Sequence, residues 1–132
     1  MGLKNSSNFA ATFARLRAIL EPYAAKMIVV HDNDANYYLD TNYVMKNKQR
    51  VFFGAVQVKK SYVSYHLMPI YMCDELLSTI SQDLKKHMQG KACFNFKAVD
   101  EKLFKELAKL TKAGAARFSG DQLAKMMQSM GR

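Results

Sequence analysis

The chain has 132 residues, of which 49% are hydrophobic and 23% are charged, and its formal net charge is +9. This composition is that of a globular domain, which excludes a disordered, collagen-like or disulfide-dense protein, and the length suits one hydrophobic core. A basic field of this size attracts phosphate polymers and anionic surfaces, although attraction alone does not give recognition. We expect one domain over residues 1–132, with a core over about residues 9–115 and a short helical tail over residues 118–130.

The cellular compartment is predicted from the apolar segments and the cysteines. The longest mostly apolar stretches, such as residues 51–58, stop after about eight residues, whereas a membrane-spanning helix needs roughly 20. Arg15 and Arg17 interrupt the apolar positions near the amino terminus, so this segment does not match a secretory signal. We expect a cytoplasmic protein without a membrane partner, in which Cys73 and Cys93 are reduced thiols that pack as small hydrophobic side chains.

A first helix is predicted near the amino terminus. Ser6 or Ser7 can cap it, because a serine hydroxyl accepts a hydrogen bond from a free amide of the first turn. Apolar residues then recur every three or four positions, as on one buried helical face: Phe9, Phe13, Leu16, Leu20 and Tyr23. Pro22 should end or kink this helix near Leu20 or Glu21, unless it opens a short second turn.

Two hairpins are predicted next. A short apolar run, Met27–Val30, and the segment Tyr37–Thr41 flank a turn-rich break at residues 32–36, which is typical of a hairpin. Two longer strands follow, Val51–Lys59 and Ser61–Met68, and they should pair as a second hairpin.

The second half of the chain is predicted to be mostly helical. Asp74 can cap a shorter helical segment, through Leu76, Leu77, Ile80 and Leu84, that ends at Gly90. A last strand, Cys93–Lys97, places Phe94 and Phe96 on one side.

The most regular helical pattern begins at Asp100 or a residue beside it, and Gly114 is its natural stop. Its apolar stripe consists of Val99, Leu103, Leu107 and Leu110. A short, loosely docked final helix is expected after residue 118, with Leu123, Met126, Met127 and Met130 as its apolar edge.

These elements predict an α+β fold of two layers: a meandering antiparallel sheet of about five strands, with the N-terminal helix and the C-terminal helices on one face. Side chains alternate between the two faces of a sheet, so each face can be assigned. The core face should hold Phe52, Val56, Val58, Val63, Tyr65, Leu67, Tyr37, Leu39, Phe94 and Phe96. The opposite face should hold Tyr38, Asp40, Phe53, Gln57, Lys59, Tyr62, Ser64, His66, Asn95 and Lys97. A register shifted by one residue would exchange the two faces.

The opposite face is the predicted ligand-binding site. Its aromatic rings can stack on a planar group, and its histidine and lysines can pair with an anion. The predicted ligand-binding residues are Tyr38, Asp40, Lys59, Tyr62, His66, Asn95 and Lys97. Two other occupants remain open, because aromatic residues also mark protein interfaces: a homodimer contact, or the C-terminal tail.

Two stretches of the sequence are distinctive: Phe52–Ala55 continuing to Tyr65–Leu67, and Gly90–Lys97 before the leucine-rich helix. They resemble the corresponding parts of the YdhG-like proteins, a bacterial family of unknown function. The likeness covers about residues 9–115 and implies a two-layer α+β fold with a meandering antiparallel sheet. Some members of that family are described as frataxin-like iron chaperones, and frataxins carry an acidic ridge on the first helix and the first strand. The first helix here departs from that pattern, because it offers Glu21 alone beside Arg15 and Arg17.

Metal-binding and catalytic motifs are weak in this sequence. Asp32, Asp34 and Asn36 repeat the first ligand spacing of a calcium-binding loop, but Tyr37 and Tyr43 occupy the positions that need glycine and glutamate. Asp and Asn at this density favour a hairpin turn. No phosphate-binding glycine loop, nucleophile elbow or paired zinc-ligand motif is present, so we expect no cofactor and no metal, and no catalytic residue is assigned.

The function predicted from these features is a non-catalytic binding module for a small anionic or planar ligand or a protein partner. A weakly specific nucleic-acid-associated protein is the alternative, because lysines gather in the second half: Lys85, Lys86, Lys91, Lys102, Lys105, Lys109 and Lys112. On the long helix, Glu101 and Glu106 are expected to pair with Lys105 and Lys109. A frataxin-like iron chaperone, implied by the resemblance alone, is the third possibility.

Overall fold

The computed structural model describes the backbone of residues 2–131 and the side chains of residues 9–131. Its helices are α1 (Gly2–Leu20), the 3-10 helix η1 (Glu21–Lys26), α2 (Met68–Met72), α3 (Asp74–Ser78), α4 (Gln82–Lys85), α5 (Glu101–Arg117) and α6 (Asp121–Ser129). Its strands are β1 (Ile28–Asn33), β2 (Asn36–Val44), β3 (Arg50–Val58), β4 (Val63–Leu67) and β5 (Cys93–Phe96). The predicted α+β class is confirmed.

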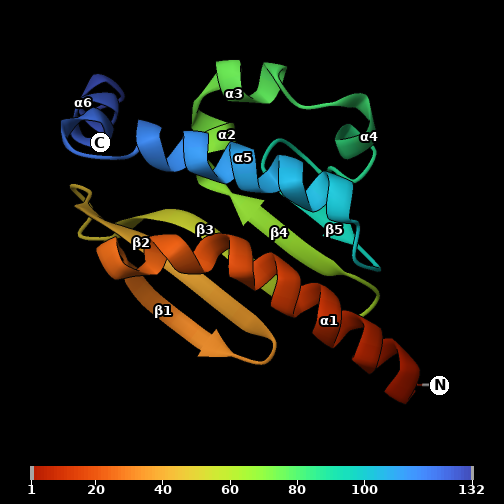
Figure 1. Cartoon of the computed structure of the whole chain (residues 1–132). Helices are drawn as coiled ribbons and strands as arrows, with labels where there is room; N and C mark the ends of the chain where they lie inside the picture. The colour runs from red at the N-terminus through yellow and green to blue at the C-terminus, as the bar shows by residue number, and fades with distance from the viewer. Residues whose placement is uncertain (1, 132) are drawn as a thin grey trace.

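The five strands form one antiparallel sheet in the order β1-β2-β3-β4-β5, so each strand pairs with its neighbours in sequence. Short turns join β1 to β2 and β3 to β4, as predicted for the two hairpins, whereas residues 68–92, which contain α2, α3 and α4, connect β4 to β5. Helices α1 and α5 lie side by side against one face of the sheet, and α2, α3 and α4 lie beside α5 (Figure 1). We call the other side of the sheet the outer face. Among the described residues, no helix has the length and apolar character needed to cross a membrane.

The core lies between the sheet and its helices. Leu16 and Leu20 of α1, Tyr65 of β4 and Leu107 of α5 are fully buried there. Burying each such side chain stabilises the fold by about 1.5–3 kcal/mol. The Tyr65 hydroxyl lies 2.5 Å from the Thr111 hydroxyl, which donates to the Leu107 carbonyl at 2.8 Å, so the polar atom of this core tyrosine is satisfied.

A β-bulge in β3 reverses the predicted alternation at one point. Leu39 pairs with Gly54 and Asp40 pairs with Phe52, so Phe53 is the extra residue of the bulged strand. The prediction for the two phenylalanines is therefore wrong: Phe53 is fully buried in the core, and Phe52 lies half-buried on the outer face. A bulge shifts the period by one residue, and two adjacent phenylalanines give no pattern from which that shift can be read.

The first helix differs from its prediction at one end. It ends at Leu20, as Pro22 predicts, and η1 follows with the proline in its first turn. It begins at Gly2, however, so Ser6 and Ser7 lie inside the helix and not at its start. Serine is favoured at the position where the chain enters a helix, but it is also tolerated within one, so the residue type alone does not fix the start.

The predicted helix after Pro69 is three one-turn helices. Pro69 lies in the first turn of α2, which was not predicted. Cys73, rather than Asp74, occupies the cap position of α3, and Asp74 is the first helical residue. Ser81 caps α4, since its Oγ accepts a hydrogen bond from the Leu84 amide at 3.1 Å.

Helix α5 begins where it was predicted but continues further. The Asp100 carboxylate accepts a hydrogen bond from the Leu103 amide at 3.1 Å, which confirms the cap. The helix passes through Gly114, the predicted stop, and ends at Arg117. Gly114 is buried against Pro69 of α2, so this glycine allows two helices to approach closely.

Candidate functional site

The predicted site residues extend over the whole outer face. One row across the sheet joins Tyr38, Ala55, His66 and Cys93 in register. Because neighbouring strands lie about 4.8 Å apart, the backbones of Tyr38 and His66 are separated by roughly 10 Å. A neighbouring row joins Asn36, Gln57, Ser64 and Asn95.

The other predicted residues lie toward the two ends of these rows. Asp40 pairs with Phe52 at one end of the face. Lys59 and Tyr62 belong to the β3–β4 turn at the other end, where the Lys59 amide donates to the Tyr62 carbonyl at 2.8 Å. Lys97 follows β5 at that end and is exposed. The structure therefore does not bring the seven predicted residues into one cluster.

Tyr38 lies at the centre of an aromatic group at one end of the face. Its ring centroid is 4.7 Å from that of Phe52 and 5.7 Å from that of His31. Burial raises the pKa of the Tyr38 hydroxyl, and the nearby Asp40 carboxylate adds to the effect. Burial also raises the pKa of Asp40, while Arg50 acts in the opposite direction.

A cavity of about 550 Å³ opens beside this aromatic group, and we call it the outer cavity. It lies between the β2–β3 connection, α2 and α6. Its lining residues are Tyr38, Asp40, Met45, Lys48, Gln49, Arg50, Val51, Phe52, Met68, Tyr71, Met72, Met127 and Met130. Methionine side chains are flexible and polarisable, so such walls adapt to ligands of different shapes.

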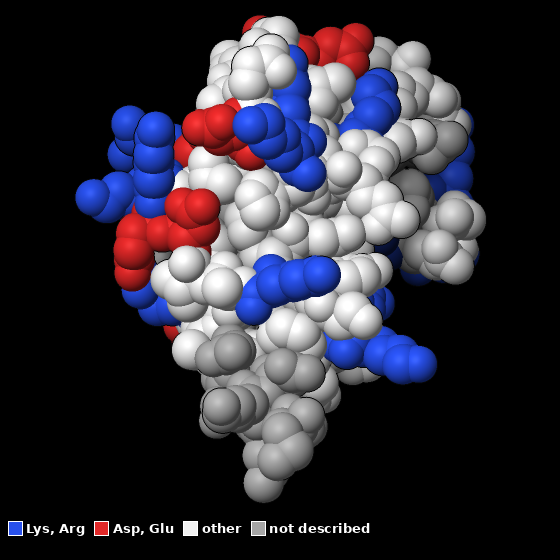
Figure 2. All heavy atoms as spheres, turned by 90° about the vertical axis from the view of Figure 1, so that its right-hand side faces the viewer, with Lys and Arg blue, Asp and Glu red and all other residues white. Residues whose placement is uncertain are grey.

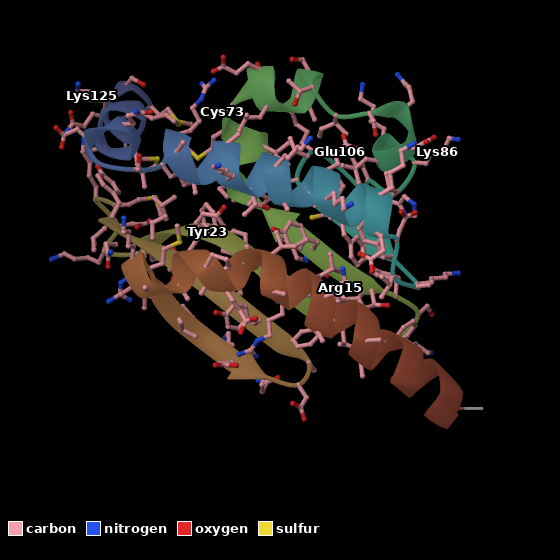
Figure 3. The ribbon with its side chains drawn as sticks, viewed as in Figure 1. Arg15, Tyr23, Cys73, Lys86, Glu106 and Lys125 are labelled. Carbon is pink, nitrogen blue, oxygen red and sulfur yellow. The ribbon has the colours of Figure 1, made fainter. Side chains whose placement is uncertain are left out.

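A second cavity, of about 770 Å³, lies on the helix side of the same end of the molecule. We call it the helix-side cavity. Its lining residues are Pro22, Tyr23, Lys26, Met27, Thr41, Asn42, Tyr43, Lys112, Ala115, Ala116, Phe118, Ser119, Gly120, Leu123 and Ala124. Tyr23 extends from η1 toward α5 (Figure 3). Helix α6 lines both cavities, and its Leu123 and Met127 are buried, so the C-terminal tail is docked rather than loose.

The middle of the outer face contains three polar side chains whose mutual contacts the sequence did not predict: Ser64, His66 and Cys93. His66 Nδ1 lies 3.0 Å from the Cys93 sulfur, and His66 Nε2 lies 2.8 Å from the Ser64 hydroxyl. Burial lowers the pKa of His66, and Lys59 lowers it further. Burial raises the pKa of the Cys93 thiol, and Lys59 opposes that shift. A correct pairing of β4 with β5 would have predicted this contact, because it places His66 directly opposite Cys93.

The charged residues are dispersed over the surface. Figure 2 shows basic and acidic side chains scattered over the side of the molecule that it presents. Lys86 extends from α4, where its Nζ lies 3.6 Å from Asp83 (Figure 3), and Lys91 lies 3.7 Å from Asp74. These two lysines are therefore partly neutralised.

The predicted ion pairs along α5 are replaced by contacts with other elements. Glu101 forms an ion pair with Arg15 of α1 rather than with Lys105, although Lys105 contributes to lowering the pKa of Glu101. Glu106 accepts hydrogen bonds from the Ser81 amide at 2.8 Å and from its hydroxyl at 2.6 Å. Arg15 and Glu106 can be followed in Figure 3.

The acidic segment before Tyr37 forms the predicted hairpin turn. Asn33 Oδ1 accepts a hydrogen bond from the Ala35 amide at 2.9 Å, between β1 and β2. Asp32 forms an ion pair with Arg17 at 2.5 Å. Within the described part of the chain, no group of three or more His, Cys, Asp or Glu residues is placed to hold a metal ion.

Comparison with known proteins identifies no relative. No family model, no curated protein and no solved structure matches the chain. The resemblance to the YdhG-like proteins therefore stays a prediction.

Proposed function

We propose that the protein is a non-catalytic binding module, and that the outer cavity takes a small ligand with a planar apolar body and an acidic group. The observation that carries the proposal is the outer cavity itself, which combines the Tyr38 and Phe52 rings with the cationic side chains of Lys48 and Arg50. Ligand pockets in proteins are typically concave and mostly apolar, with a few polar groups that fix the ligand's orientation.

The aromatic group supports a planar ligand. The Tyr38 and Phe52 rings are inclined to each other by 36°, and Tyr71 adds a third aromatic side chain that is largely exposed. Stacking on such rings is favourable because the ligand loses apolar contact with water and gains dispersion contacts. The methionines of α2 and α6 supply the remaining apolar walls.

The charges around the outer cavity support an anionic ligand. Lys48 and Arg50 line it together with one carboxylate, that of Asp40. Burial raises the pKa of Asp40, which means that its charged form is disfavoured in this environment. A ligand carboxylate or phosphate would find a net cationic rim, and the Arg50 guanidinium can bind it with two parallel hydrogen bonds.

Thermal shift and calorimetric titration test the proposal. We would measure naphthoate, adenosine monophosphate and the uncharged naphthyl alcohol, because a ligand of the folded state raises the melting temperature. We expect an anion to bind, and Phe52→Ala and Arg50→Gln each to weaken it by about tenfold, which corresponds to about 1.4 kcal/mol.

The matched control is Lys112→Gln, because Lys112 lines the helix-side cavity instead. This variant should leave the affinity unchanged. The proposal is wrong if none of these compounds binds, or if only Lys112→Gln weakens binding. Sedimentation at several protein concentrations distinguishes a homodimer through the same face, because a dimer would make the apparent mass rise with concentration.

The second candidate function is weak binding of nucleic-acid backbones through α5. The observation that favours it is that Lys102, Lys105, Lys109 and Lys112 are exposed on this helix, while its two glutamates contact Arg15 and Ser81. The lysine row has no interleaved aromatic rings, so it would follow phosphates without reading bases. Binding to RNA should fall steeply with added salt, and it should weaken in a Lys105→Gln, Lys109→Gln double variant. Absence of binding at about 50 mM salt would exclude this function.

A further inference from the structure

We propose that Cys93 is a modification site whose thiol, with His66 as the proton acceptor, reacts with low-molecular-weight disulfides to form a mixed disulfide. The two residues lie directly opposite each other on β4 and β5, and both side chains are on the outer face. The distance of 3.0 Å between Cys93 Sγ and His66 Nδ1 is within hydrogen-bond reach. A nucleophile and a base at this distance, with the base oriented by a third group, form the arrangement used in nucleophilic activation.

Ser64 is the third group, and its hydrogen bonds define the role of each ring nitrogen. The Ser64 hydroxyl donates to the Gln57 carbonyl at 3.4 Å, so its oxygen can accept the Nε2 proton of His66 at 2.8 Å. This arrangement leaves the lone pair of Nδ1 directed at the Cys93 thiol. Ser64 is buried, so the imidazole is held in position from the side away from Cys93.

The surroundings of the pair favour attack on an anionic or neutral reagent. Lys59, in the turn directly after β3, is a charged residue whose field reaches both His66 and Cys93. Among the described residues, uncharged polar side chains lie beside the pair: Gln57 on β3, Asn95 on β5, and Gln89, which accepts a hydrogen bond from the Asn95 amide group at 2.9 Å. His87 Nδ1 donates a hydrogen bond to the Asn95 carbonyl at 2.9 Å, and the His87 ring stacks on that of Phe96. Both Cys93 and His66 are partly exposed, so a small reagent can reach them.

The reaction balances without a further oxidant. The Cys93 proton moves to His66 Nδ1, and the sulfur attacks one sulfur atom of the reagent disulfide. A bond forms between Cys93 and that sulfur as the reagent's own sulfur–sulfur bond breaks. The departing thiolate takes the proton from the imidazolium and leaves as a thiol. Cys93 is thereby oxidised, and half of the reagent is reduced.

Burial gives this pair a recognisable kinetic signature. Burial lowers the pKa of His66 and raises that of Cys93, so both groups are neutral over a wide range around pH 7. Between those two pKa values, the reaction through His66 does not depend on pH, because the proton only moves within the pair. A buried thiol without such a base would instead react about tenfold faster for each pH unit, as its thiolate fraction grows.

Cys73 is the internal control. It is buried among the helices, on the other side of the sheet from the pair, near the end of α5 (Figure 3). Burial raises the pKa of its thiol, and the charged groups that act on it are Arg117 and Asp74 rather than an imidazole. Cys73 should therefore react slowly, with a rate that rises with pH.

The experiment treats the 132-residue chain with oxidised glutathione from about pH 6.5 to about pH 8.5 and follows each cysteine by peptide mass spectrometry. We expect Cys93 to react at least about tenfold faster than Cys73 near pH 7, with a flat rate profile. His66→Gln should slow Cys93 by about tenfold or more and restore a rate that rises with pH. Cys73→Ser should change nothing at Cys93.

Two results would overturn the proposal: equal rates for the two cysteines, or a His66→Gln profile that matches the wild type. If thermal melting shows that His66→Gln is unfolded, the wild-type profile decides. A rate at Cys93 that rises with pH in the same way as at Cys73 would then exclude His66 as the proton acceptor.

Discussion

Gly114 of α5 lies so close to Pro69 of α2 that a Cβ atom at position 114 would stand 2.7 Å from the proline Cβ. Real Cβ atoms do not approach a neighbour at that distance, and the proline ring cannot swing away, so one helix would have to move. The close packing of these two helices therefore requires the absence of a side chain at position 114.

Gly114→Ala should destabilise the protein, although alanine is the better helix former by about 1 kcal/mol. Overpacking a core typically costs about 1–3 kcal/mol, which exceeds that gain. Urea denaturation measures the net change. Ala108→Gly, at an exposed position in the middle of the same helix, is the control and should lose about 1 kcal/mol through helix propensity alone. A more stable Gly114→Ala variant would show that α2 does not pack against this residue.

The β-bulge predicts opposite consequences for two adjacent phenylalanines. Phe53→Ala should cost about 3–5 kcal/mol of unfolding free energy, because Phe53 is fully buried against the core, where it lies near Tyr23 and Phe118. Phe52→Ala should cost clearly less, because Phe52 remains half-exposed on the outer face. Denaturant titration of the two variants compares them directly. Equal losses, or a larger loss at Phe52, would mean that the strand lacks the bulge.

His66 should make stability depend on pH. Its pKa in the folded protein is lower than the ordinary value of 6.5, first because of burial and then because of Lys59. The unfolded chain therefore binds a proton more readily, so this contribution to stability is present above pH 6.5 and is lost as the pH falls through the folded-state pKa. The free energy of unfolding should be measured above pH 6.5 and below the folded-state pKa of His66. On acidification it should decrease less in His66→Gln than in the wild type.

His31 and His87 are present in both proteins, so the difference between the two curves reports His66 alone. Parallel curves for His66→Gln and the wild type would contradict a folded-state pKa below the ordinary value.

Metal binding provides a test of the iron-chaperone alternative. We predict no specific iron or calcium binding at micromolar concentration, because Asp32 is paired with Arg17 and the net charge of +9 repels cations. Calorimetric titration of the wild type should show no stoichiometric site. A triple variant with Asp32, Asp34 and Asp40 changed to Asn is the control. A site that is present in the wild type and lost in this variant would revive the iron-chaperone function.

Local sequence patterns determined most of the secondary structure, because their physical causes act within a few residues. The spacing of Phe13, Leu16 and Leu20 places one face of α1 in the core. The Asp100 side chain caps α5 three residues away. The Asp- and Asn-rich turn joins β1 to β2, and alternation assigned Tyr38 and His66 to the outer face.

Tertiary structure alone decided the features that depend on residues far apart in the chain. Phe53 turns inward because of how β3 pairs with β2, and Gly114 lies within a helix because Pro69 packs against it. The seven predicted site residues spread over the outer face because they occupy different rows of the sheet, while α6 completes a cavity around two of them. Cys93 meets His66 only through the register of β4 and β5, since their contact is set by hydrogen bonds between strands and not by spacing along the chain.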